Sequence, residues 1–212
     1  SLPLFTDISF LIQGMDTFDT LSTICVAFLY GRIVTSTWNI YKHFDTVEKH
    51  VTRYDIFNNQ NIFYQVHTVL LGLKNVKTKN VIKLRCDEVY TNLLPIINSM
   101  MDEPNKIITT NIFIRNIFEF PYHCSDHIFG GSVELIQRLF IGAEHLIHNR
   151  VPYKPMACFK HKFWVPEQIL CIGFLIYYYP LYSLGKENCH LIMNKHFKSA
   201  NLLSLSPEIV AY

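Results

Sequence analysis

The sequence predicts an α/β fold with a single domain, in which a mixed, mainly parallel sheet is flanked by helices. The first observation behind this prediction is the near-continuous apolar run Asp7–Gln13, which ends at Gly14 and has the pattern of a strand covered on both faces. The second is the helical spacing of the apolar residues directly after it. The third is the return of strand patterns at 32–37 and, more weakly, at 51–57, so that strands and helices alternate.

The two helices of this first part have recognisable ends. The helix after the first strand is expected to begin at Asp16 or Thr17 and to end at Gly31. Asn58 or Asn59 is expected to cap a long second helix. The apolar residues predicted to face the core are Phe18, Leu21, Cys25, Phe28 and Leu29 in the first helix and Ile62, Phe63, Val66, Leu70 and Leu73 in the second.

The alternation continues to about the middle of the chain. A strand is predicted at 80–85, and another at 106–114 because that segment is rich in β-branched residues. The helix between them is expected to bury Tyr90, Leu93, Leu94, Ile97 and Met101. Beyond an aromatic loop at 118–127, only helical patterns occur, at 133–140 and 166–179. The second half is therefore interpreted as a substrate-facing extension of an α/β nucleotide-type fold.

Composition and charge exclude several classes of protein. Half of the 212 residues are hydrophobic and 17% are charged, which excludes a disordered chain. A net charge of +2 provides no broad basic field, so nucleic acid is not an expected partner. The six cysteines include no Cys-x-x-Cys pair, which favours reduced thiols and a cytoplasmic location.

No secretory or membrane-spanning segment is expected. No charged-then-apolar leader follows Ser1, and the longest apolar stretch, at 169–184, is shorter than the roughly 20 residues that span a bilayer. Because the first residue is not methionine, the sequence is also compatible with a domain excised from a longer chain.

Polar residues occur where the predicted strands end. In open parallel sheets, ligands bind outside the carboxyl ends of the strands. The residues delivered there are Gln13, Gly14, Ser36, Thr37, Asp55, Arg85, Asp87 and Glu88. Only the strand at 80–85 ends in an acidic pair, and with Lys83 and Arg85 beside it this pair suits Mg²⁺ or Mn²⁺ bridging the protein to a diphosphate. An equally open alternative is that the acids cap the following helix.

The standard phosphate-binding loops are absent from the sequence. No G-x-x-x-x-G-K-[ST] motif occurs, and Gln13-Gly14-Met15 is not the beginning of a G-x-G-x-x-G fingerprint. P-loop NTPases and ordinary dinucleotide dehydrogenases are therefore not expected. A bound nucleotide would depend on a metal ion to neutralise its phosphates.

A second group of candidate residues lies around Asp126. This acid could orient sugar hydroxyls or act as a base, and the alternative is that it forms an Asx turn. His123 and His127 flank it at the spacing of a metal-binding pair on a helix. Pro121 and the glycines at 130–131 indicate a loop instead, which argues against a zinc site.

Three later residues are further candidates. Glu167 lies in the first turn of the predicted helix at 166–179, where its alternative role is to complement the helix dipole. His190 and His196 could complete a metal site from a late segment of the chain, although most single histidines do not bind metals.

Several of these segments form an ordered set, which consists of Asp7-Ile-Ser-Phe-Leu-Ile-Gln-Gly14, Thr35-Ser-Thr-Trp38, Asn59-Gln-Asn61, Gly72-Leu73, Val81-Ile-Lys-Leu-Arg-Cys-Asp87 and Ser125-Asp-His-Ile-Phe-Gly130. In this order and spacing the sequence resembles the WavE-like glycosyltransferases of surface-polysaccharide synthesis. It resembles more closely the GT-A glycosyltransferase domains encoded by chlorella viruses. The match covers most of residues 7–140, together with Pro166-Glu-Gln168.

The resemblance implies a GT-A fold, in which a Rossmann-like sheet binds a nucleotide-sugar and an Asp-x-Asp-type motif holds a metal ion. The matching residues are Cys86-Asp87-Glu88, so Asp87 is the expected ligand, with Glu88 or His190 completing the set. The expected donor site consists of Gln13, Gly14, Asp55, Asn61, Gln65 and Arg85, together with the strand residues Thr37 and Lys83. Residues 1–115 would form the nucleotide-sugar half and residues 116–212 the acceptor half.

The resemblance also implies an activity. A hexose or deoxyhexose would pass from a UDP-sugar to a glycan or glycoprotein acceptor, with Mn²⁺ or Mg²⁺ as cofactor, in the synthesis of viral capsid glycoproteins or of a surface polysaccharide. In an inverting enzyme Asp126 would be the base, and in a retaining one, which the resemblance slightly favours, Asp126 or Glu167 would steady the sugar. The degenerate metal motif leaves open an alternative, a catalytically silent carbohydrate- or nucleotide-binding module.

Overall fold

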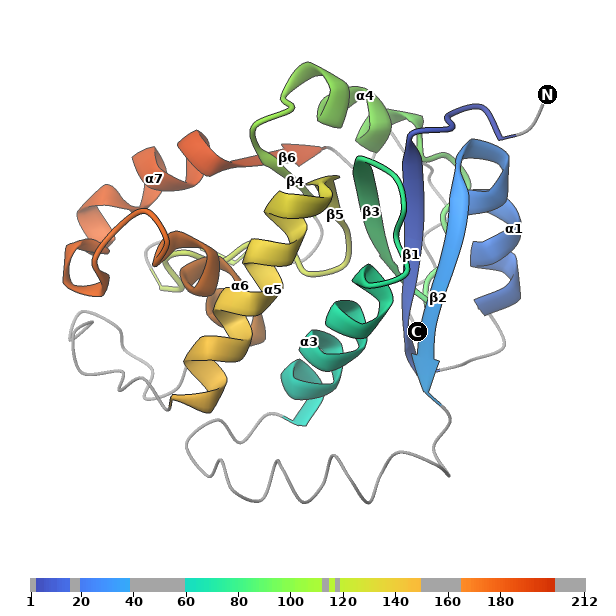
Figure 1. The fold of residues 1–212 in the computed structure, drawn as a ribbon. Helices are drawn as coiled ribbons and strands as arrows, with labels where there is room; N and C mark the ends of the chain where they lie inside the picture. Colours follow the sequence, from blue (N-terminus) through green and yellow to red (C-terminus); the bar gives the residue numbers. More distant parts are fainter. Residues whose placement is uncertain are drawn as a thin grey trace.

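A six-stranded sheet forms the centre of the protein (Figure 1). The structure is a computed structural model, and it describes residues 3–15, 20–38, 60–111, 115–116, 119–149 and 165–200. In the described part of the chain the strand order is β2-β1-β3-β5-β4-β6. The strands are β1 (Ile8–Met15), β2 (Arg32–Trp38), β3 (Asn80–Arg85), β4 (Ile107–Thr110), β5 (Phe129–Ser132) and β6 (Phe197–Ala200).

Strand directions confirm the predicted mixed, mainly parallel sheet. β1 is parallel to both β2 and β3, and β4 is parallel to β6. β5 lies antiparallel between β3 and β4. The register places Gln13 of β1 opposite Ser36 of β2 and opposite Arg85 of β3. The carboxyl ends of β1, β2 and β3 therefore share one edge of the sheet.

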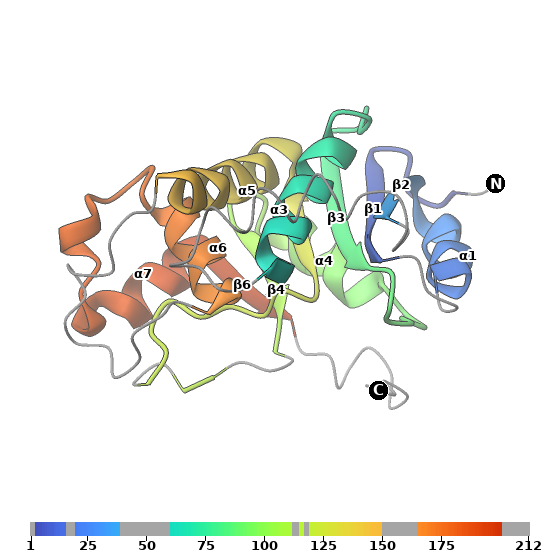
Figure 2. The same cartoon turned by 90° about the horizontal axis from the view of Figure 1, so that it is seen from below.

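Helices cover both faces of this sheet (Figure 2). On one face α1 (Thr20–Tyr30) contacts β1 and β2, and α4 (Leu94–Asp102) contacts β4, β5 and β6. On the other face lie α3 (Gln60–Leu73) and α5 (Val133–His148), and α6 (Pro166–Leu175) packs on α5. Two short 3-10 helices, Leu181–Ser183 and Lys186–Asn188, precede α7 (Cys189–His196), which leads into β6. None of the described helices combines the length and the apolar character that crossing a bilayer requires.

The alternation of side-chain direction along the strands explains why a hydrophobic core lies on each face of the sheet. Successive side chains of a strand point to opposite faces. Leu11 and Val81 accordingly belong to the core beneath α3 and α5, whereas Ile12 and Ile82 belong to the core beneath α1 and α4. All four side chains are fully buried. The prediction that the first strand is covered on both faces is therefore confirmed.

The face that α1 turns to the sheet was predicted wrongly. Leu21, Cys25, Phe28 and Leu29 are exposed, and the buried residues are Thr20, Thr23 and Ala27. The reason is that small and hydroxylated residues meet the loop that follows β3. The hydroxyl of Thr20 donates to the carbonyl of Cys86 at 3.5 Å, and that of Thr23 donates to the carbonyl of Glu88. These hydrogen bonds to the loop after β3 fix the orientation of α1, which therefore differs from the orientation that the spacing of its apolar residues predicts.

The helix after β3 begins later than predicted. Pro95 lies in its first turn, a position that favours a helix start, so Tyr90 and Leu93 are buried in the preceding loop. Inside the helix the buried residues are Ile96, Ile97 and Met100, whereas Leu94 and Met101 are exposed.

Short elements account for most of the other differences. The strand predicted at 106–114 spans only Ile107–Thr110 in the structure, and β5, α7 and β6 were not predicted as elements. β5 has the sequence Phe-Gly-Gly-Ser and β6 has Phe-Lys-Ser-Ala, and neither shows the β-branched alternation that marks a strand. The strand predicted at 51–57 lies outside the described residues.

Two glycines set the close approach of α5 and α6. A Cβ added at Gly142 would overlap the backbone of Gly173. Gly142→Ala is therefore expected to lower the free energy of unfolding by about 2 to 3 kcal/mol, because neither backbone can move away freely. Urea denaturation measures this difference. Gly131→Ala is the matched control, since the nearest atom to its new Cβ would be 3.5 Å away, and an equal loss in both variants would contradict the prediction.

Candidate functional site

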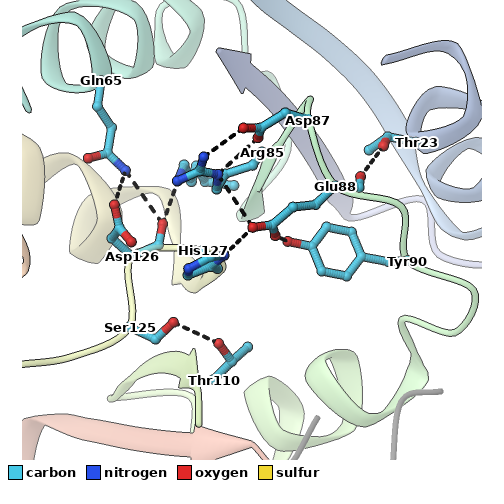
Figure 3. Close-up of polar contacts among 11 residues, drawn as sticks. Thr23, Gln65, Arg85, Asp87, Glu88, Tyr90, Thr110, Ser125, Asp126 and His127 are labelled. Atoms are coloured by element: carbon cyan, nitrogen blue, oxygen red, sulfur yellow. Dashed lines mark hydrogen bonds and ion pairs between the residues drawn. The ribbon is translucent and has the colours of Figure 1, made fainter. Parts of the chain in front are cut away.

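The candidate site lies at the carboxyl edge of β1, β2 and β3 (Figure 3). Gly14, near the end of β1, has φ of +138°, and a Cβ there would lie 2.6 Å from Sγ of Cys86. The amide of Cys86 donates to the carbonyl of Gln13 at 3.0 Å. Only glycine fits a position that combines this conformation with this contact. The end of β1 and the loop after β3 are thereby held together, with Thr37 of β2 opposite Gly14.

Lys83 is a fully buried cation beneath this edge. Its Nζ donates to the backbone carbonyl of Asp126 at 2.6 Å. Burial lowers the pKa of Lys83 to about 8, although the nearby carboxylates, that of Asp126 first, oppose the shift. The ammonium group is thus held charged at neutral pH in a place that gives it little solvation.

Arg85, at the end of β3, forms a bidentate ion pair with Asp87. Nε donates to Oδ1 at 2.9 Å and the terminal nitrogen donates to Oδ2 at 2.6 Å. Burial raises the pKa of Asp87, but the hydrogen bonds and charge of Arg85 more than offset this and hold the pKa below its ordinary value. The Asp87 side chain is 44% exposed and that of Arg85 34%, so a ligand in solution can reach both groups.

The carboxylate of Glu88 contacts more side chains than that of Asp87. Its carboxylate accepts a hydrogen bond from the phenol of Tyr90, contacts Nδ1 of His127 and lies 3.5 Å from Nε of Arg85. Burial, followed by the charge of Glu88, raises the pKa of Tyr90, which keeps its phenol protonated as a donor. The hydroxyl of Thr23 also donates a hydrogen bond to the backbone carbonyl of Glu88. Glu88 therefore fixes the loop after β3 onto the neighbouring elements.

Asp126 lies on the loop before β5 and faces α3. Its Oδ2 accepts a hydrogen bond of 3.2 Å from Nε2 of Gln65, which α3 supplies. The preceding residue, Ser125, is held by β4, because the Thr109 hydroxyl donates to its carbonyl at 2.6 Å and the Thr110 hydroxyl donates to its Oγ at 3.0 Å. Figure 3 shows that Asp126 and Asp87 flank the group formed by Arg85, Glu88 and His127.

Glu167 occupies the first turn of α6, as predicted. Its Oε2 lies 3.8 Å from Nε2 of His123, a distance too long for a hydrogen bond. Burial raises the pKa of Glu167, and the negative charge of Asp126 adds to this increase. Glu167 therefore lies within the electrostatic reach of Asp126.

His190 is not brought to this site. It lies exposed on α7, where its Nε2 is 3.0 Å from the side-chain amide of Asn194. α7 leads into β6, and β5 and β4 lie between β6 and β3 in the sheet. Figure 1 shows α7 at the end of the molecule opposite to β1. The histidine that the structure places beside Glu88 is His127 and not His190.

Asp87 is the acid at this edge that could hold a divalent cation. In the part of the chain that the structure describes, no three histidine, cysteine or acidic side chains gather as a metal cage. Mg²⁺, however, is commonly held by one or two carboxylates together with substrate phosphates and water. Asp87 is the acid whose position and exposure suit that mode, whereas the carboxylate of Glu88 is committed to Tyr90 and His127.

Some predicted residues cannot be placed fully. Asp55 lies outside the described residues, and Asn61 lies in the first turn of α3 without a described side chain. Sequence reasoning considered His127 only as a zinc ligand and did not associate Tyr90 or Thr23 with the site. The contacts of Thr23 and His127 with Glu88 join segments that are distant in the sequence, whereas Tyr90 is only two residues from Glu88, and no local pattern signals any of the three.

Comparison with known proteins finds only similarities of the backbone fold to solved structures. No protein-family model and no curated protein matches the chain. Mouse xyloside xylosyltransferase 1 in its apo form aligns over 93% of this chain and 86% of its own, with 7% identity and a TM-score of 0.43. A putative glucose-1-phosphate thymidylyltransferase from Bacillus anthracis, in complex with sucrose, aligns over 66% and 75%, with 8% identity and a TM-score of 0.34. Likenesses of this degree carry no information on the chemistry of the site.

Proposed function

We propose that the chain is a glycosyltransferase that transfers a hexose or deoxyhexose from a UDP-sugar to a glycan or glycoprotein acceptor. One observation carries the proposal: Lys83, Arg85 and Asp87 lie together at the carboxyl edge of three parallel strands. This edge is where open α/β sheets bind their ligands. The ordered motifs that resemble GT-A glycosyltransferases support the same conclusion.

The residues of this edge have distinct roles in the proposal. Arg85 is the cation that the diphosphate of the donor contacts, and Lys83 adds positive charge from beneath the surface. Gln13 and Gly14 at the end of β1 lie beside the nucleotide in this proposal, and Thr37 lies opposite Gly14 in the register. Asp87 would hold Mg²⁺ or Mn²⁺ jointly with the diphosphate, and the metal would stabilise the negative charge of the departing nucleoside diphosphate.

The acids of the second half face the sugar in this proposal. Gln65 orients the carboxylate of Asp126 on the donor side, and Glu167 belongs to the acceptor side. In an inverting reaction Asp126 accepts the proton of the acceptor hydroxyl, and in a retaining reaction Asp126 or Glu167 steadies the sugar. Retention, which the sequence resemblance slightly favours, remains a prediction.

One observation favours a second candidate function, a catalytically silent module that binds a nucleotide or carbohydrate. Both acids of the metal motif already have partners within the chain. Asp87 is paired with Arg85, and Glu88 contacts Tyr90 and His127. A module that never binds a metal would keep these pairs intact. Metal dependence therefore distinguishes the two functions.

A thermal-shift series tests the proposed function. UDP, GDP, CDP and NAD are each added with and without Mn²⁺, and UDP with Mn²⁺ is expected to raise the unfolding temperature by several degrees. A ligand at about 100 times its dissociation constant adds roughly 2.7 kcal/mol of stability. Hydrolysis of UDP-sugars then establishes turnover. Stabilisation without a metal and without hydrolysis would favour the binding module, and stabilisation by NAD alone would contradict the transferase.

A further inference from the structure

His123 and Glu167 form an incomplete pair beside the acceptor side of the site. The His123 side chain is fully buried, and neither of its ring nitrogens forms a hydrogen bond with any residue that the structure describes. Oε2 of Glu167 is buried and lacks a hydrogen bond in the same way, and it lies 3.8 Å from Nε2 of the histidine. Buried polar groups normally have partners, so two such groups facing each other require an explanation.

The segment that carries His123 is held in an unfavourable conformation. Tyr122, directly before it, has φ of +56°, which is uncommon for a residue other than glycine. Its amide donates to Sγ of Cys189 at 3.0 Å, and its phenol donates to the carbonyl of Gly185 at 2.7 Å. Such conformations persist when the surroundings enforce them, and they cluster at functional sites.

The start of α6 fixes the other half of the pair. Pro166 begins the helix, and Oε1 of Gln168 accepts a hydrogen bond of 3.3 Å from the amide of Val165. The amide nitrogen of the Gln168 side chain donates to the carbonyl of Pro121 at 2.8 Å. Gln168 therefore ties the loop of His123 to the helix end that presents Glu167.

The surroundings determine the proton state of the pair. Burial lowers the pKa of His123 to about 4, and the charge of Arg115 adds to this, so the imidazole is neutral at neutral pH. The charged or titratable groups that act on the pair are Arg115, Asp126 and His127. A neutral imidazole carries one N–H donor, and a buried carboxylate needs a donor to remain ionised.

We propose that His123 is a positioning residue for Glu167, and that a hydrogen bond from its Nε2 fixes the Glu167 carboxylate on the acceptor side of the site. A shift of less than 1 Å from the observed separation of 3.8 Å completes this bond. The proposal rests on the proposed function for its catalytic meaning. The contact itself can be tested without any substrate.

NMR titration of ¹³C-labelled glutamate, followed at the Glu167 side chain, tests the contact. His123→Phe removes the donor, so the apparent pKa of Glu167 is expected to rise by about one unit, a tenfold change in its ionisation constant. His123→Asn keeps a donor and should preserve most of the wild-type value. His148→Phe is the matched control, because His148 lies 3.9 Å from Glu144 in an exposed pair and its loss should leave Glu167 unchanged.

The outcomes separate the proposal from the proposed function. Identical titration of Glu167 in the wild type and in His123→Phe, or equal shifts in both His123 variants, would overturn the proposal. If His123→Phe does not fold, the ¹⁵N signal of His123 Nε2 is compared between wild type and Glu167→Gln, and an unchanged signal likewise overturns it. A protein that shows the coupling but binds no nucleotide would refute the proposed function alone.

Turnover tests the catalytic meaning of the contact. In a protein that transfers sugar, His123→Phe should lower kcat by about tenfold or more, the order expected when a reacting group is mispositioned, and leave the KM for the donor unchanged. An unchanged kcat, or a loss confined to the KM for the donor, would overturn the positioning role.

Discussion

Lys83→Met is expected to abolish the stabilisation of the protein by UDP without making the fold less stable at pH 7. The buried ammonium has a pKa of about 8 in place of 10.5, and such a shift corresponds to an unfavourable contribution of about 3 kcal/mol at neutral pH. Methionine removes this contribution and loses one hydrogen bond to the carbonyl of Asp126, which is worth about 1.5 to 3 kcal/mol. The variant should therefore be at least as stable as the wild type in urea denaturation.

The pH dependence gives this prediction a definite sign. Between pH 8 and pH 10.5 the unfolded chain binds more protons at Lys83 than the folded chain, so the stability of the wild type rises with pH in that window. The variant should lack this rise. Lys106→Met is the control, because Lys106 forms only a partly exposed ion pair with Glu103. A large loss of stability at pH 7, or unchanged UDP binding, would show that Lys83 serves the core and not the ligand.

Asp87→Ala is expected to remove the metal-dependent part of UDP binding and to lower turnover by at least about 100-fold. The fold should be almost unaffected, because a partly exposed ion pair contributes less than about 1 kcal/mol. The substitution also releases Arg85 from its bidentate partner. UDP binding in the absence of metal should therefore be retained or strengthened.

Titration calorimetry with UDP, with and without Mn²⁺, measures both parts of this prediction. Glu103→Ala is the matched control, because it breaks a comparable ion pair with Lys106 that lies away from the end of β3. A variant whose UDP affinity still increases on addition of Mn²⁺ would show that Asp87 does not hold the metal. Equal losses with and without metal would place Asp87 in the nucleotide site itself.

The three strands that build the site could be predicted from sequence because their patterns are local. β1 and β3 are runs of apolar residues covered on both faces, and the predicted strand at 80–85 coincides with β3. The inward face of α1 could not be predicted in this way. Its Thr20 and Thr23 are buried because they bind carbonyls of the loop after β3, more than 60 residues further along the chain.

The site shows the same division between local and distant information. The strand-end position of Arg85, Asp87 and Glu88 follows from the sequence, since a strand directly precedes them. The partners of Glu88 do not, because His127 is 39 residues away and approaches only through the antiparallel pairing of β3 with β5. The pair of Glu167 and His123 likewise depends on the tie between α6 and the loop at Pro121.

Backbone NMR of the ¹⁵N-labelled protein, titrated with UDP and Mg²⁺, tests most directly whether the edge of β1, β2 and β3 is the donor site. The expected result is that the amide signals of Gly14, Thr37, Arg85 and Asp87 shift together with a single affinity, and that those of α7, around His190, remain unchanged. Shifts that centre on α7, or on any surface away from the ends of these strands, would contradict it.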